Sequence, residues 1–268
     1  VSGNRAEVTN LGWEIEKEAL LANFSNIGVK KVGLLNDLEA FAWGVLTLSD
    51  ENLTEINQGN KAEGNKAVVA AGTGLGMAGL VNLGNGNYRP YATEGGHTTF
   101  APHKGDEFIL DKLTELYSGH VSFERVVSGK FGFSSLYHSL KGSFSEESSA
   151  VFADFDSKHL GPEIARCAAG GNDLALAVID KFFYYYGVVS SNFALMQKSI
   201  GGLYIAGGVA PKLKNFLLQR PAFMDGFLSK GRFSDFLIDI PIYLVEDEYC
   251  ALQGSSNYLN QLTEVSAS

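Results

Sequence analysis

Residues 32–37 of the chain read Val-Gly-Leu-Leu-Asn-Asp. We expect Val32–Leu35 to form a short buried strand, because the run is apolar and stops abruptly at two polar side chains. Open α/β sheets present ligand-binding groups in this way, at the carboxyl ends of their strands. Asn36 and Asp37 are also good N-caps for the apolar segment Leu38–Leu48, and taken alone the pair favours a helix cap.

Composition limits the classes of protein to consider. The chain has 268 residues, 45% hydrophobic and 19% charged, which is typical of a globular protein with a substantial core. Its net charge of -9 disfavours binding to nucleic acid or to an anionic membrane, because both need clustered Lys and Arg. The two cysteines, Cys167 and Cys250, lack metal-ligand spacing, which disfavours a disulfide framework and favours a reducing cytoplasm.

Strands and helices alternate through the rest of the chain, which predicts an α/β fold. The expected strands are Lys66–Ala71, Met77–Leu83, Tyr88–Thr93, Gly202–Ala206 and Ile240–Val245. The segment Gly161–Met196 is predicted to form two helical pieces. The second piece is a core helix containing Phe182, Tyr185, Tyr186, Val189 and Phe193.

The turn Gly72-Thr73-Gly74-Leu75-Gly76 joins two of these strands. A dinucleotide fingerprint, Gly74-x-Gly76-x-x-Gly79, is excluded, because it must open a helix and the hairpin signal at 84–87 leaves no room for one. A tight hairpin turn is the simpler alternative. Three glycines and a Thr exceed what a hairpin needs, so we favour a loop whose N–H groups bind phosphate.

Three further polar or glycine-rich motifs are weak individually. Glu94-Gly95-Gly96-His97 is also compatible with a solvated loop, and Glu124 with a favourable charge near a helix start. Gly207-Gly208 after an apolar strand is more typical of a packing turn than of a nucleotide contact. No second His or Cys lies at zinc-ligand spacing from His97, so no protein metal site is predicted.

In this order, however, the motifs closely resemble the bacterial-type glucokinase family. The matching segments are Thr9-Asn10-x-x-Trp13, Asn36-Asp37, Gly72–Gly76, Glu94–His97, Glu124–Gly129 and Ala206–Pro211, and the resemblance extends from Ser2 to about Leu262. It implies a hexokinase-like and actin-like ATPase fold whose two lobes close over ATP and sugar. We expect 1–48 to be the remainder of the small N-terminal lobe, 49–246 the large α/β lobe, and 247–268 a C-terminal helix returning to the small lobe.

The resemblance also implies a role for each motif. Asp37 matches the catalytic base, and the sugar-binding set is Asn36, Asp37, Glu94, His97 and Glu124. Gly72, Thr73, Gly74 and Gly76 match a phosphate motif, and Gly207 and Gly208 an adenosine motif. The implied reaction is phosphorylation of glucose at its 6-hydroxyl with ATP and Mg²⁺, by a cytoplasmic homodimer. A non-catalytic sugar-binding or regulatory relative is the alternative. The sugar-type cluster disfavours an actin-like structural ATPase.

The chain departs from the family pattern in two places. It contains no Asp-x-Gly-Gly-Thr phosphate motif, and Val1 falls inside a family segment. We therefore expect a truncated chain with an incomplete N-terminal lobe rather than a divergent protein that lost the motif. We also expect the 268 residues alone not to be a competent kinase. Ala251-Leu252-Gln253-Gly254 replaces the usual Gly-Leu-x-Gly. The related repressor and sugar kinase family is excluded, because its zinc site needs cysteines that residues 98–120 lack.

Overall fold

The computed structural model describes residues 3–8, 12–152 and 160–264. Its internal contacts divide the chain into two compact units, one made of Val1–Ser49 with Asp247–Ser268 and the other of Asp50–Glu246. They are called unit 1 and unit 2 below, and each is described by itself. Thr9 and Asn10 of the first family motif lie outside the described residues. None of the described helices is both long enough and apolar enough to cross a lipid bilayer.

Unit 1 combines a β-hairpin with two packed helices. Its elements are β1 (Arg5–Val8), β2 (Trp13–Glu16), α1 (Lys17–Phe24), the 3-10 turn η1 (Ser25–Ile27), α2 (Asp37–Val45) and α12 (Cys250–Glu264). The helices α2 and α12 approach closely through two glycines. A Cβ on Gly44 would overlap the carbonyl of Cys250, and one on Gly254 would overlap the carbonyl of Ala40. The absence of a side chain at these glycines therefore permits the contact.

The strand expected at Val32–Leu35 is not formed, and that prediction was wrong. No strand is assigned between η1 and α2, and in the described part of unit 1 β1 and β2 pair only with each other. A strand needs a hydrogen-bonded neighbour, which an apolar run does not supply by itself. The segment packs on α12 instead, where Gly33 lies against the ring of Tyr258.

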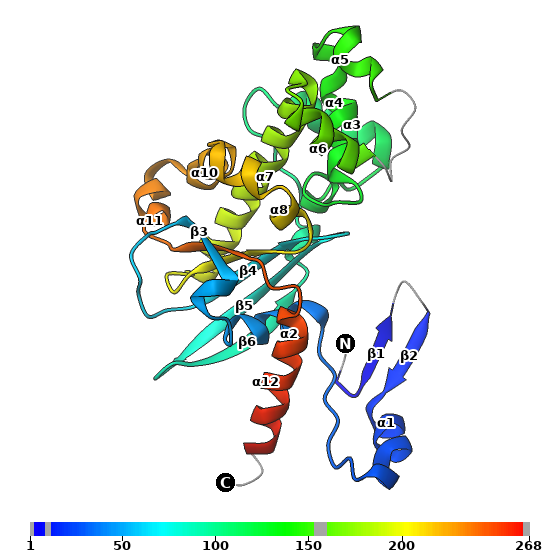
Figure 1. Cartoon of the computed structure of the whole chain (residues 1–268), viewed down its shortest axis with the longest axis vertical. Helices are drawn as coiled ribbons and strands as arrows, with labels where there is room; N and C mark the ends of the chain where they lie inside the picture. Colours follow the sequence, from blue (N-terminus) through cyan, green and yellow to red (C-terminus); the bar gives the residue numbers. More distant parts are fainter. Residues whose placement is uncertain (1–2, 9–11, 153–159, 265–268) are drawn as a thin grey trace. The chain divides into compact units, whose positions relative to one another are not determined.

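Unit 2 is built on a mixed sheet with the order β3-β8-β7-β4-β5-β6 (Figure 1). Its strands are β3 (Leu53–Asn57), β4 (Lys66–Ala71), β5 (Leu75–Gly84), β6 (Asn87–Thr93), β7 (Leu203–Ala206) and β8 (Ile242–Val245). The β4–β7 and β7–β8 pairs are parallel and the other pairs antiparallel. The expected strand at Lys66–Ala71 is confirmed, whereas β5 begins at Leu75, two residues earlier than expected.

The helices of unit 2 lie along the chain between β6 and β7 and between β7 and β8. They are α3 (Glu107–Tyr117), α4 (Gly132–Leu140), α5 (Glu146–Ala150), α6 (Leu160–Ala169), α7 (Asp173–Gln197), α8 (Val209–Lys212), α9 (Lys214–Gln219), α10 (Ala222–Leu228) and α11 (Ser234–Ile238). Single 3-10 turns are η2 (Asp50–Asn52), η3 (Gly95–His97), η4 (Phe123–Arg125), η5 (Lys141–Ser143) and η6 (Gly231–Phe233).

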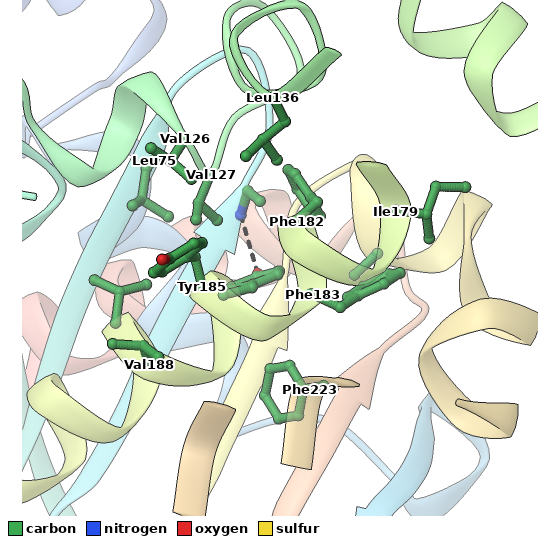
Figure 2. Close-up of a cluster of buried hydrophobic side chains, with 14 of the residues drawn as sticks. Leu75, Val126, Val127, Leu136, Ile179, Phe182, Phe183, Tyr185, Val188 and Phe223 are labelled. Carbon is green, nitrogen blue, oxygen red and sulfur yellow. Dashed lines mark hydrogen bonds between the residues drawn. The ribbon is translucent and has the colours of Figure 1, made fainter. Parts of the chain in front are cut away.

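The long helix α7 is the centre of the core, as predicted. Phe182, Tyr185, Tyr186, Val189 and Phe193 are all buried. Figure 2 shows Phe182, Phe183 and Tyr185 gathered with Val126, Val127 and Leu136 from the segments before α6. The site elements described below therefore rest on the same core as α7.

The hydroxyl of Tyr186 connects α7 to the ends of two parallel strands. It lies 2.8 Å from the carbonyl oxygen of Val69 and 3.1 Å from that of Ala206, and it accepts a hydrogen bond from the N–H of Ala71 at 3.1 Å. A phenol has one proton, so it donates to one of these carbonyls at a time. Burial raises the pKa of this hydroxyl, which keeps it protonated at physiological pH.

Tyr186→Phe is expected to lower the free energy of unfolding by about 1–3 kcal/mol, because it leaves the buried Ala71 N–H without its partner. Urea denaturation measures the change. Tyr243→Phe is the control, since the described residues show no hydrogen bond to the Tyr243 hydroxyl and the sheet ladder is unaffected. Equal stabilities of Tyr186→Phe and the control would show that the hydroxyl does not hold these strand ends.

Candidate active site

The glycine turn is a three-residue hairpin loop between β4 and β5. Ala71 pairs with Leu75, and the N–H of Gly72 donates to the carbonyl of Gly74 at 2.9 Å. Within the described residues, no hydrogen bond is recorded from the N–H of Thr73 or Gly74. Residues 72–74 therefore form a tight hairpin turn, the simpler of the two alternatives. The turn nevertheless leaves the N–H groups of Thr73 and Gly74 available to a ligand.

A second glycine segment sets the direction of those N–H groups. The N–H of Gly129 donates to the carbonyl of Gly72 at 2.7 Å, and that of Lys130 donates to the carbonyl of Thr73 at 3.3 Å. In a trans peptide the C=O of one residue points opposite to the N–H of the next. The N–H groups of Thr73 and Gly74 therefore point away from the segment at 129–130.

Gly129 is part of the family motif, but the sequence by itself indicates no separate role for it. A Cβ there would lie 2.9 Å from the carbonyl oxygen of Gly72 and 3.2 Å from Val209 Cγ2. Any larger residue would separate the two segments. The signal for this contact was a glycine at the end of a helical turn, which does not identify its partner.

The other predicted nucleotide motif begins where β7 ends. Gly207 has φ +82° and its Cβ would overlap the backbone of Ala71, so a glycine is needed there for both conformation and packing. This confirms the packing alternative for Gly207. Gly208 differs, because a Cβ on it would have nothing within 4 Å. Open space for a ligand thus adjoins Gly208 and not Gly207.

Glu94 precedes η3 and His97 is the last residue of η3, which packs on the start of β5. A Cβ on Gly96 would overlap the carbonyl oxygen of Leu75, so Gly96 permits this close approach. The side chains of Glu94 and His97 are 88% and 60% exposed, and His97 Nε2 lies 3.9 Å from Glu94 Oε2. That separation is too long for a hydrogen bond. Both side chains can therefore bind a polar ligand without breaking a bond within the protein.

Glu124 reaches the same strand start from η4. The N–H of Phe123 donates to the carbonyl of Thr98 at 3.0 Å, and Thr99 forms an isolated bridge with Ser122, so η4 lies beside the segment that follows η3. Glu124 Oε2 accepts a hydrogen bond from the N–H of Leu75 at 3.2 Å. The carboxylate therefore has a specific partner in the glycine turn.

A partly buried ion pair holds the segment that follows η3. Asp106 accepts hydrogen bonds from Lys181 Nζ at 2.6 and 2.7 Å and from the Tyr185 hydroxyl at 2.7 Å, and the N–H of His103 donates to the same hydroxyl at 3.2 Å. This network ties the chain after His97 to α7. The network cannot be predicted from the sequence, because nothing local links Asp106 to residues on a helix far along the chain.

Asn36 and Asp37 lie in unit 1 and form a helix cap. The side-chain oxygen of Asn36 accepts from the N–H groups of Leu38 at 2.9 Å and Glu39 at 3.4 Å, and Asp37 Oδ1 accepts from Leu38 at 2.9 Å. The capping interpretation is therefore confirmed. Asn172 and Asp173 begin α7 in the same way, with Asn172 accepting from Ala175 at 2.9 Å. Capping geometry alone thus does not distinguish a catalytic Asp37.

Within unit 2 the structure brings together Glu124, Glu94, His97 and the glycine turn at the start of β5, with Gly207-Gly208 at the neighbouring strand end. Asn36 and Asp37 belong to the other unit. No group of three or more His, Cys, Asp or Glu side chains suited to a metal ion occurs among the residues that the structure describes. Both cysteines are free and buried.

Comparison with known proteins gives consistent matches over most of the chain. A family model described as Glucokinase matches residues 1–262. A glucokinase of Synechocystis sp. is 35% identical over 272 residues, covering 96% of this chain and 75% of that protein. The crystal structure of a glucokinase from an Antarctic psychrotroph is 29% identical with a TM-score of 0.80, covering 97% of this chain and 77% of its own.

A more distant structure shares the fold alone. It is a glucokinase of Streptomyces griseus from the ROK family, solved with glucose and AMPPNP, which is 18% identical with a TM-score of 0.65 and covers 95% of this chain and 77% of its own. The predicted α/β fold of the actin-like ATPases is thereby confirmed. The family match and the identity to curated glucokinases together show that this chain belongs to the glucokinase family.

Proposed function

We propose that this protein transfers the γ-phosphoryl group of ATP to the 6-hydroxyl of glucose. Besides family membership, one observation carries the proposal. Two available N–H groups, on Thr73 and Gly74, lie next to a carboxylate, that of Glu124, which is bound to the same turn. N–H groups suit phosphate oxygens, and carboxylates suit sugar hydroxyls. Groups suited to the phosphoryl donor and groups suited to the sugar therefore lie next to each other within unit 2.

The acceptor sugar is neutral and carries many hydroxyls. Glu94, His97 and Glu124 supply hydrogen-bond acceptors and donors to them, and the exposure of Glu94 and His97 leaves these side chains accessible to the ligand. Asn36 is assigned to the sugar as well, through its amide nitrogen, because its oxygen already caps α2. These assignments extend the residue matches to the family, and each stays a prediction until it is tested.

Asp37 is assigned as the base. Phosphoryl transfer passes through a loose transition state, so positioning and charge stabilisation dominate and the proton of the attacking hydroxyl leaves late. Asp37 would orient the 6-hydroxyl and accept that proton. Its own hydrogen bond to the Leu38 N–H uses Oδ1 and leaves Oδ2 for the sugar.

The donor is assigned to the glycine turn, with Thr73 and Gly74 offering N–H groups to its phosphates and Gly208 adjoining open space for the nucleoside. Gly72, Gly76 and Gly207 support these segments. Mg²⁺, where bound, supplies charge neutralisation at the β- and γ-phosphates, and such ions bind largely through phosphate oxygens and water.

Units 1 and 2 are proposed to be the small and large lobes of the kinase. The homodimer and the cytoplasmic location stay predictions from the resemblance.

The first test uses the protein expressed from its complete coding sequence. We expect glucose-dependent formation of ADP and of glucose 6-phosphate in equal amounts, measured with a coupled dehydrogenase assay, and no reaction when Mg²⁺ is chelated. Glucose binding without any turnover would instead support the non-catalytic sugar-binding alternative.

Asp37→Ala is expected to lower kcat by about 10²–10⁴-fold, since a base acts in the transition state, while much of the glucose binding remains. Asp173→Ala is the matched control, because Asn172-Asp173 begins α7 with the same cap and the same position of the acidic residue. It should keep the unmodified kcat. A rise in the KM for glucose with kcat unchanged would make Asp37 a binding residue and not the base.

His97→Ala is expected to raise the KM for glucose roughly tenfold through loss of a hydrogen bond, with little change in thermal stability because the side chain is 60% exposed. His103→Ala, an exposed histidine six residues further on, is the control and should leave the KM unchanged. If the two variants had the same KM, His97 would not contact the sugar.

A further inference from the structure

The space beside the Cα of Gly74 is occupied by a side chain from another segment, that of Glu124. Its φ is outside the left-handed region, so the backbone conformation there does not require glycine. A Cβ added to Gly74 would lie 2.5 Å from Glu124 Oε2 and 3.4 Å from Glu124 Cδ, with no other atom of the described residues within 4 Å. A Cβ at position 74 would therefore displace one carboxylate, which lies at the end of a flexible side chain and can shift.

The same carboxylate is held by the next residue of the turn. Glu124 Oε2, the oxygen that faces Gly74, is the one that accepts the Leu75 N–H at 3.2 Å. A hydrogen bond to an ionised acceptor is stronger than one between neutral groups. The Glu124 oxygen therefore packs against the Cα of Gly74 and accepts a hydrogen bond from the N–H of Leu75.

The turn is thereby divided between two tasks. The N–H groups of Thr73 and Gly74, at its apex, are available to a ligand, whereas that of Leu75, where β5 begins, is bound to Glu124. The start of β5 also carries η3, since Gly96 packs on the carbonyl of Leu75. Residues 74–75 thus contact two segments assigned to the sugar, Glu124 and η3.

We propose that Gly74 and the Leu75 N–H are a positioning site for the Glu124 carboxylate, so that a segment assigned to the phosphoryl donor also sets the geometry of sugar binding. The inference rests on the proposed function, in which Glu124 binds glucose. A Cβ at position 74 would push the carboxylate off the Leu75 N–H. Gly74→Ala should therefore weaken glucose binding even with no nucleotide present, which a purely donor-binding loop would not do.

Gly72 offers a matched comparison within the same turn. Its φ is also outside the left-handed region, and a Cβ on it would meet nothing within 4 Å. Gly72→Ala changes the same chemical group two residues away without touching Glu124. Any effect of alanine substitution on the turn in general should appear in both variants.

The experiment measures the Kd for glucose by isothermal titration calorimetry without nucleotide, on the protein expressed from its complete coding sequence. The variants are Gly74→Ala, Gly72→Ala, Glu124→Ala and the double variant Gly74→Ala with Glu124→Ala. We expect Gly74→Ala to raise the Kd roughly tenfold, well beyond any change in Gly72→Ala, whose Cβ meets no atom of Glu124. The double variant should match Glu124→Ala alone, because residues that act through one interaction are not additive.

Two results would overturn the inference: an unchanged glucose Kd for Gly74→Ala, or a Gly74→Ala effect that appears in full on top of Glu124→Ala. If Gly74→Ala does not fold, the double variant decides. It lacks the overlap and should fold, and its failure to fold would also overturn the inference. Failure of the proposed function is recognised separately, because the unmodified protein would then bind no glucose.

Discussion

The arrangement of the site depends on how the ends of β4 and β7 are held. The parallel ladder between them ends at Ala70 and Ala206, and beyond this pair the two strands leave for different glycine turns. Backbone groups at such a point lose their ladder partners and must find others. The buried Tyr186 hydroxyl meets this need for Ala71 and for one of two carbonyls at a time. Helix α7 thereby holds both turns at the same end of the sheet, where β4 and β7 finish.

At these strand ends, the segments of the candidate site contact one another through the backbone of glycines. Gly96 lies on Leu75, Gly129 on Gly72, and Gly207 on Ala71, each closer than a side chain allows. Of these glycines only Gly207 has a positive φ. At Gly96 and Gly129 the glycine permits a close contact between two segments, and its backbone conformation is ordinary. Each segment therefore restricts where its neighbour can lie.

These contacts explain why the N–H groups of Thr73 and Gly74 lie near a carboxylate, that of Glu124. A phosphate-binding loop needs N–H donors, and a carboxylate beside it repels the donor's charge unless it is held at a distance from the phosphates. Glu124 is instead fixed on the Leu75 N–H, while the available N–H groups of Thr73 and Gly74 point away from the segment at 129–130. In the proposed function, a neutral sugar and a charged donor would therefore use different groups of the same turn.

The amino-acid sequence by itself determined the family, the α/β class, the strand Lys66–Ala71 and the buried face of α7. Each of these depends on composition, periodicity or motifs that are read within short windows. Tertiary structure decided what depends on partners far along the chain. Val32–Leu35 lacks a pairing strand and so forms none, and Gly207 is confirmed as a packing residue by its contact with Ala71. The partner of Glu124 lies 49 residues away at Leu75, and no local pattern encodes a hydrogen bond over that separation.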